Sequence, residues 1–101
     1  MRVEKHLRSL YSLEGKVILL TGAAGGIGSI LAKGLAEAGG TIALCDIEGS
    51  GLESVRAEIA ANGGTADCFF LDLMGKASIR SLVPPVGERF HPIDVLITNA
   101  A

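Results

Sequence analysis

Short apolar runs alternate along the chain with segments whose apolar residues recur at helical spacing. Residues 16–21 (KVILLT) and 41–45 (TIALC) are continuous apolar runs, which are typical of strands buried on both faces of a parallel sheet. Residues 66–71 and 93–98 (IDVLIT) predict a third and a fourth strand. The pattern therefore predicts four strands with intervening segments long enough for helices.

Two of these intervening segments have the spacing of amphipathic helices. The first helix is expected to begin near Ile27 and to stop at residues 39–40, and the second to stop at residues 62–64, both glycine-containing. Ser50 and Glu53 have the S-x-x-E spacing of a capping box, which predicts where the second helix begins. The predicted buried faces carry Ile27, Ile30, Leu31, Leu35 and Ala38 in the first helix, opposite Ser29, Lys33 and Glu37, and Leu52, Val55 and Ile59 in the second.

A third helix is expected over residues 78–90, because a parallel crossover needs about a dozen residues or more. Pro84-Pro85 contradicts a continuous helix there, since an interior proline removes a hydrogen bond and clashes with the preceding turn. We therefore predict a break or kink near Val83.

Alternating strands and helices imply an α/β fold with a parallel sheet and right-handed crossovers. Strand order 3-2-1-4 would make the first half of a doubly wound sheet, with a ligand crevice between strands one and four. We assign residues 1–14 to an N-terminal lead-in and residues 15–101 to this α/β domain.

The turn after the first strand, residues 21–28 (TGAAGGIG), has the spacing T-G-x-x-x-G-x-G. Gly22 can turn sharply out of the strand, Gly26 would let the backbone approach a pyrophosphate, and Gly28 would let the helix pack against the strand. Unpaired N–H groups and the dipole at the helix start would then attract negative charge. The turn therefore predicts phosphate binding, and the alternative is a tight connection that binds nothing.

Asp46 ends the second strand, 18 positions after Gly28. That is close to the spacing, about 20 residues, at which an acidic side chain accepts the ribose hydroxyls of an adenosine. The carboxylate would repel a 2′-phosphate, and residues 23–25 offer no Arg or Lys to hold one, so NAD is favoured over NADP. The alternative is an Asp that caps a helix or is solvated. Asp72 could hydrogen-bond the adenine edge or cap the next helix.

Taken in order, these segments resemble the short-chain dehydrogenase/reductase (SDR) family. The likeness covers residues 12–101: residues 12–17 are similar to the family's lead-in, residues 21–28 to its glycine loop, and Asn99-Ala100 to most of its N-A-G motif. It implies a Rossmann-like fold and hydride transfer between NAD(P) and alcohols or carbonyls, with Asn99 tying strand four into the sheet and lining the cofactor pocket. The cofactor-binding residues that the motifs and the resemblance indicate are Gly22, Ala24, Gly25, Gly26, Ile27, Gly28, Asp46, Ile47, Asp72, Leu73, Asn99 and Ala100.

The family's catalytic Tyr-x-x-x-Lys pair does not occur in residues 1–101. Such a pair is needed because a tyrosine with a pKa of about 10 is a poor base at neutral pH unless a nearby ammonium stabilises the phenolate. Tyr11 is the one tyrosine, and Gly15 stands four positions later. His6 and His91 follow no predicted strand, which favours exposed loop positions. No catalytic residue is therefore assigned.

The resemblance implies that residues 15–101 are an NAD(P)-binding Rossmann-like domain, truncated after the fourth strand. We therefore expect a cofactor-binding fragment of an NAD-dependent oxidoreductase, inactive alone, whose complete protein binds a small alcohol or carbonyl substrate and is a homo-oligomer. The alternative is a complete, non-catalytic dinucleotide-binding or sensing module. Net charge is −2 with no cluster of Lys and Arg, which argues against nucleic acid as a partner. No run approaches the roughly 18 apolar residues of a membrane span. Cys45 and Cys68 lie in apolar runs without metal-ligand spacing, which favours reduced core thiols and the cytoplasm.

Overall fold

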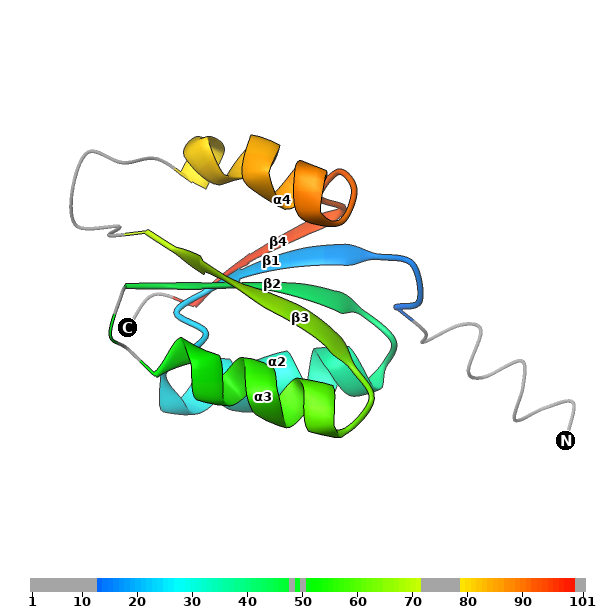
Figure 1. The fold of residues 1–101 in the computed structure, drawn as a ribbon, viewed down its shortest axis with the longest axis vertical. Helices are drawn as coiled ribbons and strands as arrows, with labels where there is room; N and C mark the ends of the chain where they lie inside the picture. The colour runs from blue at the N-terminus through cyan, green and yellow to red at the C-terminus, as the bar shows by residue number, and fades with distance from the viewer. Residues whose placement is uncertain (1–12, 48, 50, 72–78, 100–101) are drawn as a thin grey trace, which may run out of the picture.

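A four-stranded parallel sheet forms the centre of the molecule, with strand order β3-β2-β1-β4 (Figure 1). The computed structural model describes residues 13–47, 49, 51–71 and 79–99. The strands are β1 (Val17–Thr21), β2 (Thr41–Asp46), β3 (Thr65–Phe70) and β4 (Val95–Thr98). The predicted fold and strand order are confirmed, and each strand lies within two residues of its predicted position.

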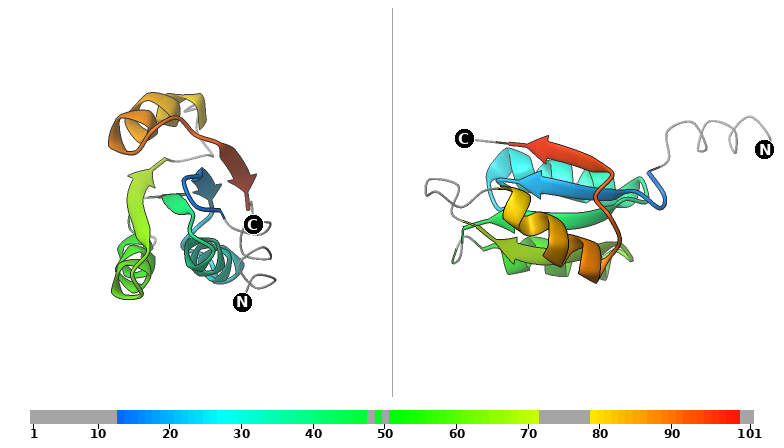
Figure 2. Two further views of the ribbon diagram at one scale, coloured as in Figure 1. Left: turned by 90° about the vertical axis from the view of Figure 1, so that its right-hand side faces the viewer. Right: turned by 90° about the horizontal axis from the view of Figure 1, so that it is seen from above.

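Helices cover the sheet unequally on its two faces. Helices α2 (Gly26–Glu37) and α3 (Leu52–Ala61) lie together on one face. The short helix η1 (Ile79–Leu82) and α4 (Val83–Arg89) lie on the other (Figure 2). This arrangement follows from the right-handed crossovers that connect parallel strands.

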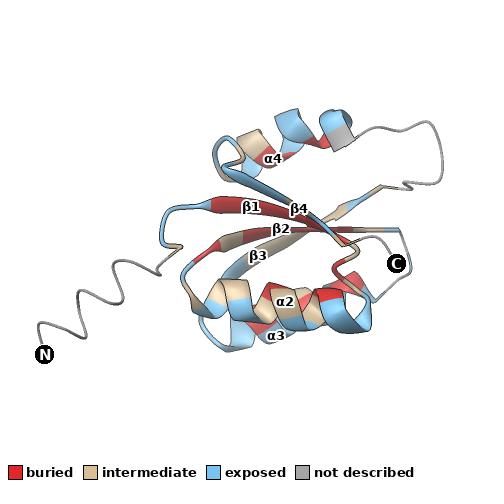
Figure 3. Cartoon of the chain, turned by 180° about the vertical axis from the view of Figure 1, so that it is seen from behind, coloured by how far each residue is buried: buried red, intermediate tan, exposed pale blue. Residues whose placement is uncertain are grey.

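The central strands are the most deeply buried part of the fold. All five residues of β1 are buried, as are the four inner residues of β2, whereas β3 and β4 are partly or largely exposed (Figure 3). Ile18, Leu20 and Leu44 face α2 and α3, and Leu19 and Cys45 face α4. Because β1 and β2 are buried on both faces, their carboxyl ends form a firm base for the turns that follow them.

The predicted buried face of α2 is partly wrong. Ile27 and Ile30 are 75% and 71% exposed, although Leu31 and Leu35 pack against the core as expected. The fully buried positions of the helix are Gly28 and Ala32. Two small residues one turn apart let the helix backbone approach the sheet closely, and this rotates the larger isoleucines away from it.

Two further details of the helices differ from, or refine, the sequence prediction. Helix α3 begins after Gly51, which has φ +90° and makes no side-chain capping bond, so the predicted capping box is not the N-cap; Ser50 lies outside the described residues. Glu53 instead accepts a hydrogen bond from Arg56 Nε at 2.5 Å.

The predicted break near Val83 is confirmed, because η1 ends at Leu82 and α4 carries its prolines in the first turn, where their missing N–H groups cost least.

Candidate cofactor-binding site

The chain leaves β1 through a turn that only glycine can make at two positions. Gly22 has φ +69°, in the left-handed region, and a Cβ there would overlap the carbonyl oxygen of Asn99. A Cβ at Gly28 would overlap the carbonyl oxygen of Gly22 and lie 2.8 Å from Asn99 Nδ2. At Gly26, by contrast, a Cβ would meet nothing within 4 Å. The first and last glycines of the motif are therefore required by packing, and Gly26 faces open space.

Asn99 fastens the end of β4 to the same turn. Its backbone N–H donates to the carbonyl oxygen of Thr21 at 3.3 Å and to Thr21 Oγ1 at 3.2 Å. Its side-chain Nδ2 donates to the carbonyl oxygen of Gly22 at 3.3 Å. The predicted tie between strand four and the sheet is therefore confirmed, and the Thr21 hydroxyl, buried at 1% exposure, takes part in it.

The end of β2 holds the turn from the other side. Ala23 N–H donates to the carbonyl oxygen of Cys45 at 3.2 Å, and Ala24 N–H donates to Asp46 Oδ2 at 3.0 Å. The second carboxylate oxygen, Asp46 Oδ1, accepts a hydrogen bond from Ile47 N–H at 2.8 Å. Asp46 therefore neither caps a helix nor stands free in solvent, because both of its oxygens contact backbone N–H groups beside the turn.

Helix α2 begins directly behind this turn and presents unpaired donors. Its N-cap is Gly25, which makes no side-chain capping bond, and no acidic side chain lies in the first turn. Within the described residues the structure shows no acceptor for the backbone N–H groups of Gly26, Ile27 and Gly28, whereas Ser29 N–H already donates to Gly25 O at 2.8 Å. Three adjacent donors at the positive end of a helix favour an anion.

The glycine turn, the Asp46 carboxylate and Asn99 all lie at the carboxyl ends of β1, β2 and β4, where ligands bind in open α/β sheets. The same residues match a protein-family model. That model describes the short chain dehydrogenase family and aligns with residues 16–101. The chain belongs to this family.

Two curated relatives and one solved structure are similar to the chain over only part of their own length. The chain is 36% identical over 89 residues to the short chain dehydrogenase/reductase dpchG of Colletotrichum higginsianum, covering 88% of this chain and 33% of that protein. It is 36% identical over 90 residues to the D-threitol dehydrogenase of Mycolicibacterium smegmatis, covering 89% and 35% respectively. A crystal structure of a Haemophilus influenza oxidoreductase with bound NAD superposes with a TM-score of 0.78 at 31% identity, covering 89% of this chain and 32% of that one. The chain therefore spans about a third of the length of these three proteins.

Most of the predicted site residues of this SDR chain lie together at the carboxyl ends of β1, β2 and β4. The residues that the structure brings together are Gly22, Ala24, Gly25, Gly26, Ile27, Gly28, Asp46, Ile47 and Asn99. Asp72, Leu73 and Ala100 lie outside the described residues. Thr21 begins the predicted motif but is not among the predicted site residues, although a hydroxyl at the end of an apolar strand was a usable signal.

Asp94 is a second residue that sequence reasoning missed. Its Oδ2 accepts a hydrogen bond from the buried Val17 N–H at 2.8 Å, and its own N–H donates to Val17 O at 2.9 Å. These bonds tie the start of β4 to the start of β1, at the end of the sheet opposite the site. The signal was a single acidic residue inside the otherwise apolar run 93–98.

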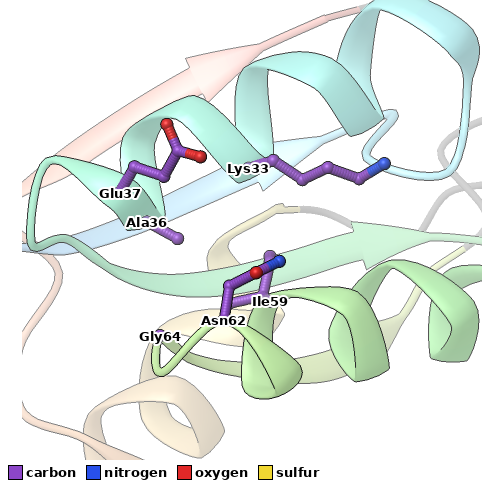
Figure 4. A pocket seen from close by; sticks show the side chains of 6 residues that line it. All are labelled: Lys33, Ala36, Glu37, Ile59, Asn62 and Gly64. Carbon is purple, nitrogen blue, oxygen red and sulfur yellow. The ribbon is translucent and has the colours of Figure 1, made fainter.

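A small pocket lies between α2 and α3, away from the glycine turn (Figure 4). It is lined by Lys33, Ala36, Glu37, Ile59, Asn62 and Gly64. Lys33 Nζ lies 2.5 Å from Glu58 Oε2, so its charge is already paired. This pocket has none of the unpaired donors that mark the turn.

In the described parts of the chain, no helix has the length and apolar character needed to cross a membrane.

Both cysteines of the described residues are free thiols, and His91 is exposed as predicted, while His6 lies outside the described residues. Burial, with a smaller contribution from the Asp46 carboxylate, raises the pKa of Cys45 to about 11. Partial burial and the Sγ hydrogen bond to Glu53 Oε2, at 3.3 Å, raise the pKa of Cys68 to about 11 as well. A raised pKa keeps a thiol neutral as pH increases through 7 and 8.

We therefore expect both thiols to react slowly with iodoacetamide at pH 8. The shift from 9.0 to about 11 lowers the thiolate fraction there by about a hundredfold relative to an unperturbed cysteine. Glu53→Gln removes the nearby charge and should speed the labelling of Cys68, leaving Cys45 unchanged as the internal control. Peptide mass spectrometry resolves the two sites, and labelling of Cys68 as fast as an unstructured cysteine peptide would contradict the expectation.

Proposed function

We propose that residues 15–101 form the cofactor-binding domain of an NAD-dependent SDR oxidoreductase that interconverts alcohols and carbonyl compounds. The observation that carries the proposal is the set of N–H groups at Gly26, Ile27 and Gly28 that have no acceptor within the described residues, in a turn whose Ala24 N–H donates to the Asp46 carboxylate. Bound NAD would supply a hydride acceptor, taking a hydride from an alcohol as a proton is released and returning it in the reverse direction.

The residues of the turn suit a dinucleotide in charge and in space. The N–H groups of Gly26 to Gly28 would bind the pyrophosphate, and the absence of a side chain at Gly26 leaves room for it. Each Asp46 oxygen accepts one backbone N–H and retains a lone pair with which to accept a ribose hydroxyl. The same carboxylate would repel a 2′-phosphate, which supports a preference for NAD over NADP.

Other proposals follow from membership of the family and not from the described residues. Asp72, Leu73 and Ala100 would contact the adenine and adjoining parts of the cofactor, and Ile47 would pack beside the adenine, where its side chain is 50% exposed. The catalytic Tyr-x-x-x-Lys pair would lie beyond residue 101, so that residues 1–101 alone would bind cofactor without turning it over. The complete protein would be a cytoplasmic homo-oligomer.

Calorimetric titration of the full-length protein with NADH and NADPH tests the proposal. We expect NADH to bind at least tenfold more tightly than NADPH. No heat with either dinucleotide would overturn the function, and tighter binding of NADPH would overturn the cofactor preference. A non-catalytic dinucleotide-binding module is the second candidate, and it would bind NADH in this titration but would oxidise no alcohol supplied together with NAD.

Asp46→Ala is expected to weaken NADH binding by about 1–3 kcal/mol, the loss that accompanies removal of hydrogen bonds to a charged group. The preference for NADH over NADPH should shrink at the same time, because the repulsion of the 2′-phosphate is lost. Glu37→Ala removes an acidic side chain from the far end of α2 and serves as the control. An unchanged NADH affinity in Asp46→Ala would place the ribose elsewhere.

A further inference from the structure

The glycine turn is attached to β2 by two successive backbone N–H groups whose acceptors are of different kinds. Ala23 N–H bonds the carbonyl oxygen of Cys45, which belongs to the backbone of β2. Ala24 N–H instead bonds a side-chain oxygen, Asp46 Oδ2, across 22 residues of sequence. The attachment of Ala23 survives any substitution in β2, whereas the attachment of Ala24 depends on which side chain occupies position 46.

The rest of the turn has few restraints of its own. Gly25 N–H reaches the carbonyl oxygen of Gly22 at 3.3 Å, near the upper limit for such a bond, and the next three N–H groups are unpaired within the described residues. Four of the eight residues from 21 to 28 are glycines, whose backbone has the most freedom to lose on ordering. The bond at Ala24, two residues before the first of these unpaired donors, therefore restricts a segment that has few other restraints.

We propose that Asp46 is a positioning residue for the phosphate-binding turn, in addition to its proposed contact with the ribose. By accepting Ala24 N–H, its carboxylate holds the donors of Gly26 to Gly28 in a binding geometry before any dinucleotide arrives. This inference rests on the proposed function, because it takes the pyrophosphate to bind at those donors. In this proposal the Asp46 side chain supports phosphate binding without contacting the phosphates.

The negative charge of Asp46 and its acceptor oxygen have opposite effects on the binding of a diphosphate without ribose hydroxyls. Removing the negative charge should favour binding of a diphosphate, whereas removing the acceptor for Ala24 N–H should disfavour it. Asp46→Asn and Asp46→Ala separate these effects, because both are neutral and only asparagine keeps a side-chain oxygen. Any difference between the two variants therefore reports the hydrogen bond and not the charge.

The test is titration of the full-length protein and its two Asp46 variants with 2′,3′-dideoxyadenosine diphosphate, which has two phosphates but no ribose hydroxyl. We expect Asp46→Asn to bind this probe about three- to tenfold more tightly than Asp46→Ala, the range of one net hydrogen bond. Equal affinities in the two variants would overturn the positioning role. Failure of the wild-type protein to bind both this probe and NADH would instead overturn the proposed function itself.

Hydrogen exchange without ligand gives a second readout that a ribose contact alone would not change. We expect the Ala24 amide to exchange at least about tenfold faster in Asp46→Ala than in wild type, with Asp46→Asn restoring most of the protection. Glu37→Ala should leave this amide unchanged. Asp46→Val supplies the same comparison if the alanine variant does not fold, and an Ala24 amide that exchanges equally fast in all variants would refute the proposal.

Discussion

Gly28→Ala is expected to destabilise the full-length protein by about 3 kcal/mol or more, at the upper end for overpacking, and to abolish measurable NADH binding. The added Cβ would overlap the carbonyl oxygen of Gly22 and crowd Asn99 Nδ2. Gly22 is backbone of the turn itself, and Asn99 Nδ2 is bonded to the same Gly22 carbonyl oxygen, so neither neighbour can yield without moving the donors at the start of α2. Denaturant unfolding and calorimetric titration measure the two losses.

Gly34→Ala, in the same helix, is the matched control for this substitution. A Cβ at Gly34 meets nothing within 4 Å, and the residue is exposed in the interior of α2. Alanine there should stabilise the protein by about 0.5–1 kcal/mol, because it reduces the backbone entropy of the unfolded chain. If Gly28→Ala proved as stable as wild type and bound NADH normally, the close packing of turn and helix described above would be wrong.

The contrast between these two glycines shows what the sequence could and could not predict. The spacing of residues 21–28 between an apolar strand and a helix predicted a phosphate-binding turn, and the structure shows that Gly22 and Gly28 are required there by packing. The motif predicted close packing of the helix at Gly28, which the structure confirms, whereas no motif assigned a role to Gly34. The overlap at Gly28 involves the carbonyl oxygen of Gly22 and the side-chain Nδ2 of Asn99, 71 residues later, and neither contact could be predicted without the fold.

The same reason explains the error in the buried face of α2. Periodicity places apolar residues on one side of a helix, but it does not say how closely that helix approaches its sheet. Because Gly28 and Ala32 make the contact, Ile27 and Ile30 are left on the flank. The hydrogen bonds from Ala24 to Asp46 and from Val17 to Asp94 were equally out of reach, since each joins residues whose proximity depends on strand order and register.

Exposure along β4 leads to the last prediction, which concerns what lies beside this strand in the full-length protein. Leu19 of β1 and Leu96 of β4 are direct partners in the parallel register. Leu19 is 1% exposed beneath α4, whereas Leu96 is 50% exposed and Val95, on the opposite face, is 37% exposed. Within residues 1–101, one leucine of this pair is therefore in the core and the other at an uncovered edge.

We expect Leu19→Ala and Leu96→Ala to destabilise the full-length protein by similar amounts, about 2–5 kcal/mol each, as measured by denaturant unfolding. Exposure within residues 1–101 alone would give Leu96→Ala a cost of only about 1 kcal/mol. The expectation differs because we propose that further chain adds strands and helices beside β4, so that a strand at the edge here is internal there. A small cost at Leu96 beside a large one at Leu19 would show instead that β4 stays uncovered, and the proposed dinucleotide site would then be open on the side of β4.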